Sequence, residues 1–362
     1  MFKNILKNTD YVILLIILIL FGIGVIGIFS AGYNSDVNQN EYIKQMIWFG
    51  VMFVALICIW FTNHSVYEYF GYVIFFVSTI LLILVLNTNS LMGAKSWFNF
   101  GGFLYQPSEL MKIGYILVAA KLFSTNFKSN LLKYSLIGVT FLIPFILILL
   151  QPDFGTAVVF IVITLFMLFI NKVKYRYLII VGLILVLAVT PIYMFGLNDI
   201  QKDRINVFLN PSLDPLGSGY NAIQSKMAIG SGMLFGTGFL QGTQTQYGYL
   251  PIKSSDFIFS VLSEELGFII SALIVILFVT LIIKIISVAK KTDSDYARYV
   301  AIGICGMIFF HFVQNIGMSI GLLPITGVPL PFVSYGGSSL MTNMIAVGII
   351  LSISARKKSY MF

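Results

Sequence analysis

Two ionisable residues stand at the start of an apolar stretch, where a charge is costly and usually functional. In the run Gln106-Pro107-Ser108-Glu109-Leu110-Met111-Lys112, a Pro–Ser pair starts a helix, and Glu109 and Lys112 lie three residues apart on one helix face. A carboxylate and an ammonium so placed can pair and offset part of each other's desolvation. The pair either docks this helix or forms a polar wall of a substrate cavity, and Lys95 and Trp97 just upstream favour the cavity.

Two aspartates precede other apolar stretches. Asp153 stands in the tight connection Gln151-Pro152-Asp153-Phe154-Gly155-Thr156, where helix capping is the favoured role and ligand contact is the alternative. Asp256 stands in Ser254-Ser255-Asp256-Phe257 and can cap a helix in the same way. A carboxylate at the end of a loop, near cations from elsewhere in the fold, is also a candidate general base for a hydroxyl nucleophile.

The elements that carry these residues are membrane spans. Of the 362 residues, 58% are hydrophobic and 10% are charged, so charged residues cannot cover a water-facing surface. Apolar runs of about 20 residues, enough to cross a ~30 Å hydrocarbon core, recur along the chain. We therefore expect an all-α, polytopic membrane protein with a single domain over 1–362 and about ten spans: 11–31, 44–61, 66–86, 108–123, 134–150, 154–170, 177–195, 258–286, 299–322 and 335–355.

Basic residues orient these spans. With the N-terminus inside, 15 of the 22 Lys and Arg residues fall in cytoplasmic segments, so the positive-inside rule places both termini in the cytoplasm. The net charge of +8 is then a topology signal and an attraction to anionic membrane lipid, and no nucleic-acid partner is expected. The long Gly-rich segment 196–257 becomes an extracytoplasmic loop between spans seven and eight. Within it, Tyr220 to Leu234 is typical of a short helix lying on the membrane face.

Other chemistries lack the residues that they need. Cys58 and Cys305 both lie in apolar spans, which supports neither a disulfide framework nor a thiolate metal site. A Gly22-x-Gly24-x-x-Gly27 match lies inside the first span with no strand before it, and the chain has no P-loop. ATP-driven work is therefore not expected.

Two further segments place polar groups or irregular backbone at membrane depth. The ninth span carries a polar stripe for which interhelical hydrogen bonding is the expected role: His311, Gln314, Asn315 and Ser319. The segment 329–339 is dense in Pro and Gly, which is tolerated at this depth only when the backbone is buried in protein or lines a cavity.

Taken together, these segments resemble the SEDS family (shape, elongation, division and sporulation), and within it most the rod-shape branch. The resemblance covers nearly the whole chain, and its motifs occur in the family's order: Gly93-Ala94-Lys95-Ser96-Trp97, 106–112, 151–156, Asp214-Pro215-Leu216-Gly217-Ser218-Gly219-Tyr220, 224–232, Asp256-Phe257-Ile258-Phe259, Glu264-Glu265-Leu266-Gly267 and 331–339. The run Gly242-Thr243-Gln244-Thr245-Gln246 favours the rod-shape branch over the division branch.

The resemblance implies a peptidoglycan glycosyltransferase that polymerises lipid II at the outer face of the cytoplasmic membrane, for cell elongation and rod shape. Its donor would be an undecaprenyl-pyrophosphate-linked disaccharide-peptide, transferred with inversion and without a covalent sugar–enzyme intermediate. A class B penicillin-binding protein would be the partner and supply the transpeptidase. The family's essential aspartate falls on Asp256, and its important tryptophan, glutamate and lysine fall on Trp97, Glu109 and Lys112.

Transfer from a polyprenyl pyrophosphate needs a base for the acceptor hydroxyl and positive charge for the leaving group. We expect Asp256 to be the base. Lys112, Arg204 and Lys226 are the expected cations, and a divalent ion such as Mg²⁺ is a further candidate, whereas no tightly bound cofactor is expected. The remaining candidates for substrate binding are Lys95, Gln106 and Asp153.

Two positions depart from the family pattern. Ser96 stands where the family usually has Arg before the tryptophan, and the neighbouring Lys95 can replace the charge but not the bidentate fork. Ile252-Lys253-Ser254-Ser255 stands in place of Glu-x-His-Thr before the aspartate. The second departure concerns the positioning of the acceptor and leaves the aspartate itself in place.

Two other functions fit the same sequence. A transporter that flips the lipid-linked precursor would also have many spans, broken helices and intramembrane charges, but its ionisable residues would gather at the midplane instead of the outer face. A non-catalytic scaffold that recruits a transpeptidase is the other alternative. Polymer made from lipid II by purified protein separates enzyme from transporter, and Asp256→Ala would leave only a scaffold intact.

Overall fold

The structure is a computed structural model. It describes residues 2–34, 39–88, 94–101, 103–170, 202, 206–210, 214 and 217–356.

Long helices account for most of the described chain, and they coincide with the predicted spans at every predicted position except 177–195, which lies outside the described residues. They are α2 (Tyr11–Tyr33), α3 (Glu41–Phe61), α4 (His64–Val85), α5 (Pro107–Ser124), α6 (Asn130–Leu149), α7 (Phe154–Ile170), α12 (Ile258–Lys291), α13 (Asp295–Ser319) and α14 (Gly337–Ala355). Seven of them are long and apolar enough to cross a bilayer; α5 carries three charged residues and α7 is shorter. The predicted helical membrane fold is confirmed.

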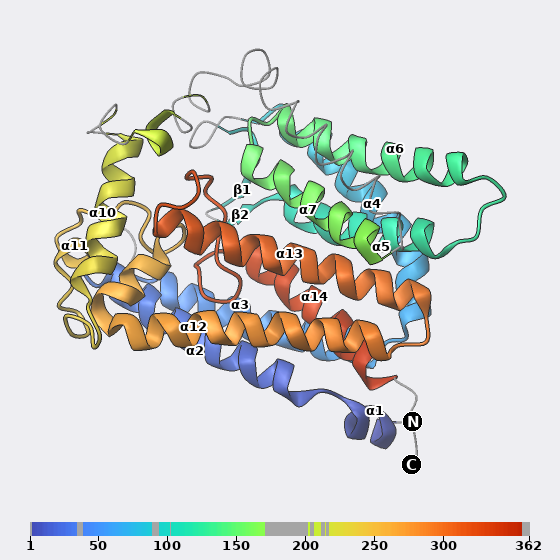
Figure 1. Ribbon diagram of the computed structural model, residues 1–362, viewed down its shortest axis with the longest axis horizontal. Coiled ribbons are helices and arrows are strands. Elements are labelled where there is room, and N and C mark those ends of the chain that lie inside the picture. The colour runs from blue at the N-terminus through green and yellow to red at the C-terminus, as the bar shows by residue number, and fades with distance from the viewer. Residues whose placement is uncertain are drawn as a thin grey trace.

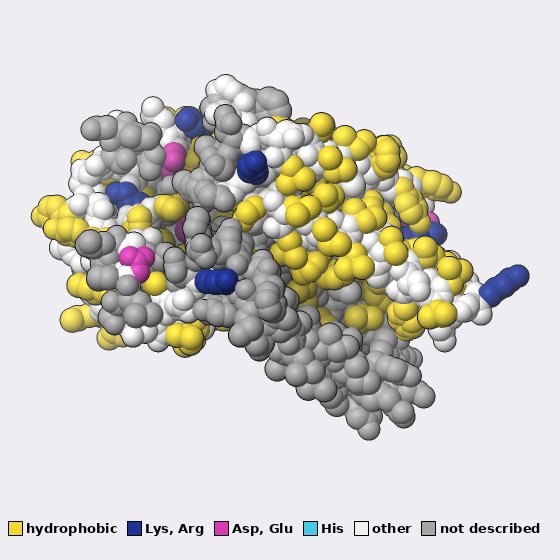
Figure 2. All heavy atoms as spheres, turned by 90° about the horizontal axis from the view of Figure 1, so that it is seen from above, with side chains coloured by type: hydrophobic (Ala, Val, Ile, Leu, Met, Phe, Trp, Pro, Cys, Tyr) yellow, Lys and Arg dark blue, Asp and Glu magenta, His cyan; other side chains and the backbone are white. Residues whose placement is uncertain are grey.

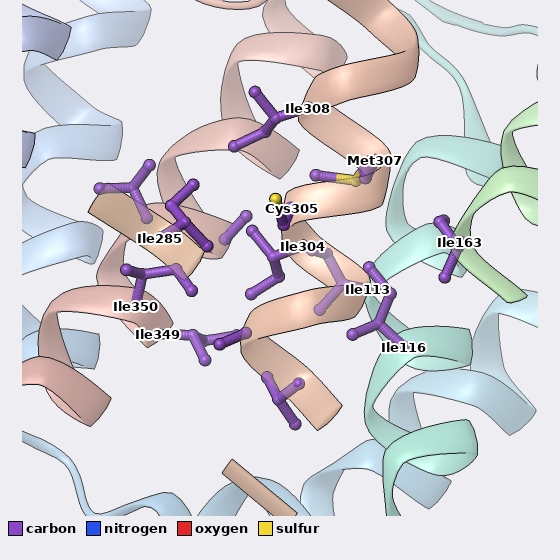
Figure 3. Close-up of a cluster of buried hydrophobic side chains, with 14 of the residues drawn as sticks. Ile113, Ile116, Ile163, Ile285, Ile304, Cys305, Met307, Ile308, Ile349 and Ile350 are labelled. Carbon is purple, nitrogen blue, oxygen red and sulfur yellow. The ribbon is translucent and has the colours of Figure 1, made fainter. Parts of the chain in front are cut away.

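The helices pack around α13 and α14, which are mostly buried, whereas α3, α4 and α6 bury few of their side chains. Figure 3 shows side chains of α13, among them Ile304 and Cys305, between those of α5 and α7 on one side and those of α12 and α14 on the other. Glycine lets neighbouring helices approach closely. At Gly114 of α5, for example, a Cβ would lie only 2.9 Å from the Phe75 Cα of α4. Apolar side chains cover much of the face in Figure 2, as expected for a surface in contact with lipid.

Shorter elements lie at the two ends of this bundle (Figure 1). The first is α1 (Phe2–Asn8), and α10 (Ser218–Ser231) and α11 (Thr243–Gln246) gather at the opposite end. The helix predicted over Tyr220 to Leu234 is thus present as α10. The strands β1 (Phe98–Phe100) and β2 (Phe103–Tyr105) pair as an antiparallel hairpin directly before α5, a departure from the all-α prediction.

The long helix α12 is broken at Gly267, which has φ 75° and ψ −172°. The backbone groups freed by the break bond to the loop that follows α10: Phe268 N donates to Met233 O at 2.8 Å, and Thr237 N donates to Glu264 O at 2.9 Å. The loop is seated so closely that a Cβ on Gly267 would collide with the Gly236 backbone. We call this contact the Gly267 joint.

Gly267→Ala is expected to lower the thermal midpoint of the purified protein strongly. The positive φ alone costs roughly 1–2 kcal/mol for a residue with a Cβ, and the collision with Gly236 adds to it. Gly50→Ala is the matched control, because Gly50 lies within α3 and a Cβ there would meet nothing within 4 Å. Equal thermal midpoints for the two variants would show that the joint does not constrain the fold.

Candidate active site

Glu109 and Lys112 form a buried ion pair on α5, as the sequence predicted. Lys112 Nζ lies 2.8 Å from Glu109 Oε1, and the two side chains are 1% and 4% exposed. On the other side, Lys112 Nζ lies 3.1 Å from His311 Nε2 of α13. Because an ammonium has only donors, the bond requires His311 to accept, which fixes its Nε2 as unprotonated.

Asp153 caps α7, again as predicted. Its Oδ1 accepts from Thr156 N at 3.1 Å, and its Oδ2 accepts from the Thr156 hydroxyl at 2.8 Å. Gln106, at the start of α5, donates its Nε2 to the same Oδ2 at 3.0 Å. The cap therefore ties the first turn of α7 to the segment that begins with Gln106 and leads into Glu109 and Lys112.

Asp256 does not cap α12, so the capping interpretation is wrong. Residues 251–257 make successive turns, the helix begins at Ile258, and the N-cap residue is Phe257, which has no side-chain cap. Asp256 is half-buried; its carbonyl oxygen accepts from Asn315 Nδ2 at 3.0 Å, and its Oδ1 accepts from the Ser255 hydroxyl at 3.2 Å. The hydrogen bond from Asn315 thus holds the main chain at Asp256, and the Asp256 carboxylate does not cap the helix.

The neighbouring Lys253 is a structural residue in this segment. Its ammonium donates to Thr245 O at 2.8 Å and is nearly buried. Burial lowers the pKa of Lys253, and the nearby Glu265 carboxylate partly opposes that shift. Lys253 thus anchors the end of the loop to α11.

The connection between α13 and α14, residues 320–336, contacts several candidate residues. The Asp256 carboxylate lies against Gly327, where a Cβ would come 3.4 Å from Oδ2. The exposed Lys226 side chain of α10 crosses Gly321, which has φ 77°, leaving no space there for a Cβ. At the start of α7, a Cβ on Gly155 would lie 2.9 Å from Thr326 O. Asp256, Lys226 and the Asp153 turn therefore all adjoin one stretch of backbone.

The buried Glu109–Lys112 pair and the Asp256 segment both contact α13, at successive positions along its axis. His311 contacts Lys112, and Asn315, one turn further on, donates to the Asp256 carbonyl and to Val328 O. One turn is about 5.4 Å along the axis. In the predicted polar stripe of α13, only the side chain of His311 bonds to a side chain of another described helix, whereas Gln314 and Asn315 donate to carbonyl oxygens of the connecting segments. The stripe thus joins the two groups of candidate residues.

The other predicted residues lie further from these contacts with α13 or outside the described chain. Lys95 is exposed, Trp97 is half-buried, and the segment is held by a bond from Lys95 N to Gln151 O. Arg204 lies outside the described residues. Among the residues that the structure describes, no three His, Cys, Asp or Glu side chains gather as a metal site, so the Mg²⁺ expectation gains no ligand set here.

Sequence reasoning missed two buried carboxylates that hold the loop. Glu264 accepts from the main-chain N–H groups of Gln244 and Thr245 at 2.7 and 3.0 Å, at the start of α11. Glu265 accepts from the Ser30 hydroxyl at 2.6 Å and from Gln246 Nε2 at 2.8 Å. Two adjacent acidic residues in an apolar helix are the signal that could have identified this role, because buried charges must be paired.

The whole sequence also resembles known proteins. The chain matches the model of the FtsW/RodA/SpoVE family, described as cell cycle protein, over residues 11–359. The chain belongs to this family. A curated member, peptidoglycan glycosyltransferase RodA of Treponema pallidum, is 35% identical over 97% of this chain and 98% of its own length. Peptidoglycan glycosyltransferase MrdB of Escherichia coli is 37% identical over 97% and 95%.

A solved structure extends the FtsW/RodA/SpoVE likeness to the fold. It is described as structural coordination of polymerization and crosslinking by a peptidoglycan synthase complex. The match has a TM-score of 0.83 and 27% identity, and it covers 96% of this chain and 97% of the other. The helical arrangement described above is therefore that of a known family of multi-pass membrane proteins.

Proposed function

We propose that this chain is a peptidoglycan glycosyltransferase that polymerises lipid II for cell elongation and rod shape. The observation that carries the proposal is the placement of Asp256. Its main chain is held by Asn315, its carboxylate is not used as a helix cap, and it adjoins the same α13–α14 connection as Lys226. A positioned carboxylate and a cation on the same stretch of backbone are the groups that hydroxyl activation and a diphosphate leaving group require.

In the proposed step, an Asp256 carboxylate oxygen takes the proton of the acceptor sugar's 4-hydroxyl. The oxygen of that hydroxyl then attacks the anomeric carbon of the donor, the bond to the polyprenyl pyrophosphate breaks, and the pair of electrons leaves on the pyrophosphate. One displacement inverts the anomeric centre. Lys226 is exposed and therefore available to the leaving group, and Arg204 is a second proposed cation.

Lys112 plays a different part from Lys226. Its ammonium is enclosed between Glu109 and His311, so direct contact with a diphosphate would require these partners to separate. We propose that Lys112 with Glu109 fixes α5 against α13, and that Gln106, Asp153, Lys95 and Trp97 line the substrate side of this wall. Mg²⁺ is proposed only as an auxiliary charge; titrating EDTA and then Mg²⁺ into the polymerisation assay tests it.

The direct test is polymerisation of labelled lipid II by the purified full chain, alone and with a class B penicillin-binding protein, the proposed partner. Glycan polymer from the chain alone supports the enzyme. Transfer of lipid II between leaflets of a vesicle without any polymer would support a transporter and overturn the proposal. A chain that stimulates its partner while Asp256→Ala has no effect would support a scaffold.

We further propose that the end of the molecule carrying α10 and α11 is extracytoplasmic and that both chain termini are cytoplasmic. In a Cys58→Ala/Cys305→Ala background, Tyr247→Cys is expected to react with a membrane-impermeant thiol reagent in intact spheroplasts, because Tyr247 is 75% exposed. Ser129→Cys, an exposed site in the α5–α6 connection, is expected to react only after lysis. The reverse pattern would invert the topology and exclude the proposed site of action.

A further inference from the structure

The loop between α10 and α11 presents three consecutive apolar side chains to the outside of the protein. Met233, Leu234 and Phe235 are 80%, 59% and 79% exposed. The sequence around them has no charged residue between Lys226 and Lys253. A water-facing loop seldom has this composition, and we call the three residues the apolar tip.

The Gly267 joint holds the apolar tip beside the outer surface of α12. Phe268 N donates to Met233 O, and Ile269 N donates to Leu234 O at 3.3 Å. Phe268 and Ile269 are themselves 62% and 52% exposed. They continue directly into the exposed apolar stripe of the α12 span: Ile269, Leu273, Ile276, Val279 and Ile283. The tip therefore extends a surface that faces lipid.

An ion pair at the other end of α12 gives the depth of this surface. Lys284 pairs with Asp10, the N-cap of α2, at 3.2 Å. Because charged side chains are costly in hydrocarbon, we place one boundary of the membrane at this pair. At about 1.5 Å per residue, Phe268 lies about 24 Å along α12 from Lys284. A hydrocarbon core is about 30 Å thick, so Phe268 and the apolar tip lie within the far leaflet and below its headgroups.

The same measure places another part of the loop outside the hydrocarbon. Asn34, the C-cap of α2, donates to Gln246 Oε1 at 3.1 Å. Asn34 lies about 36 Å along α2 from Asp10, about 12 Å beyond the level of Phe268. The neighbouring Tyr247, although 75% exposed, is thus expected in water.

We propose that the apolar tip inserts among the acyl chains of the leaflet opposite Asp10 and Lys284, as a lipid anchor that sets the height of the loop ending at Asp256. Insertion of exposed Met, Leu and Phe side chains removes apolar surface from water, which is favourable. Glu264 and Glu265, bonded to the loop, are at the same time covered from lipid. The inference concerns membrane contact and holds whether or not the chain polymerises lipid II.

The test measures depth with a fluorophore. In the Cys58→Ala/Cys305→Ala background, the full-length Phe235→Cys and Tyr247→Cys proteins are labelled with the polarity-sensitive dye NBD. They are then reconstituted in vesicles of phosphatidylcholine and phosphatidylglycerol that contain doxyl-labelled acyl chains. We expect blue-shifted emission and several-fold stronger quenching at position 235 than at 247. Met233→Cys, at the most exposed tip residue, repeats the measurement at a second site.

Equal quenching at 235 and 247, with emission typical of water, would overturn the proposal. Blue-shifted emission without doxyl quenching would also overturn it, because the tip would then be covered by a second copy of the chain instead of by lipid. Monodisperse elution of each labelled protein confirms that the exposed substitutions leave the fold intact. None of these readings depends on glycosyltransferase activity.

Discussion

Asp256→Asn is expected to lower the rate of lipid II polymerisation by about 10²–10⁴-fold, the usual contribution of a general base. The amide keeps the size of the carboxylate but cannot take the proton. The fold should be kept, because α12 is not capped by this side chain and the bond from Asn315 goes to the Asp256 carbonyl oxygen. The measurement is single-turnover glycan synthesis by purified protein, with the thermal midpoint recorded in parallel.

Asp295→Asn is the matched control for this substitution. Asp295 lies at the opposite end of α13 and pairs with Arg298 at the surface, where its side chain is 64% exposed. We expect normal polymerisation from this variant. Polymerisation near the normal rate by Asp256→Asn as well would show that Asp256 is not the base, and Glu109 and Asp153 would become the next candidates.

Breaking the Glu109–Lys112 pair has the second largest expected effect, on stability. Removing one partner leaves the other charge buried without compensation, which costs roughly 3–5 kcal/mol. Glu109→Gln and Lys112→Met should each lower the thermal midpoint and the activity. The double variant should lose less than the sum of the single losses, because it leaves no uncompensated charge.

A surface pair provides the comparison. Lys121 and Glu68 lie 3.0 Å apart with side chains 37% and 27% exposed, and such pairs contribute about 0–1 kcal/mol. Glu68→Gln and Lys121→Met should therefore change the thermal midpoint little. Additive losses at Glu109 and Lys112 would contradict the coupling seen in the structure.

Features encoded by local sequence were predictable. Length and apolarity identify each described span, the three-residue spacing pairs Glu109 with Lys112, and Asp153 precedes a helix in the usual capping position. Features that depend on distant segments were not. The bond between Lys112 and His311 joins residues 199 apart, and no local pattern specifies it.

The misassigned cap at Asp256 has a physical reason. An aspartate before an apolar stretch is a common cap, but successive turns carry the chain one residue further before the helix begins, so Phe257 takes the N-cap position. The break in α12 was missed for a similar reason. Glycine inside an apolar run is compatible with a continuous span, and only the loop that bonds to the freed backbone groups makes the break stable.

The adjacent carboxylates Glu264 and Glu265 also determine the depth of α12 in the bilayer. From the break at Gly267 to its end at Lys291, α12 is about 36 Å long, which is more than the thickness of the hydrocarbon core, so apolarity alone would let this part slide along its axis. Sliding by one turn in the direction of Lys284 would pull both carboxylates from their donors in α2, α11 and the loop, into a region where an acidic residue costs about 3 kcal/mol. The hydrogen bonds of these two glutamates thus limit how far α12 can move along the membrane normal. The depth of α12 in the lipid is therefore fixed by polar contacts at one end of the helix.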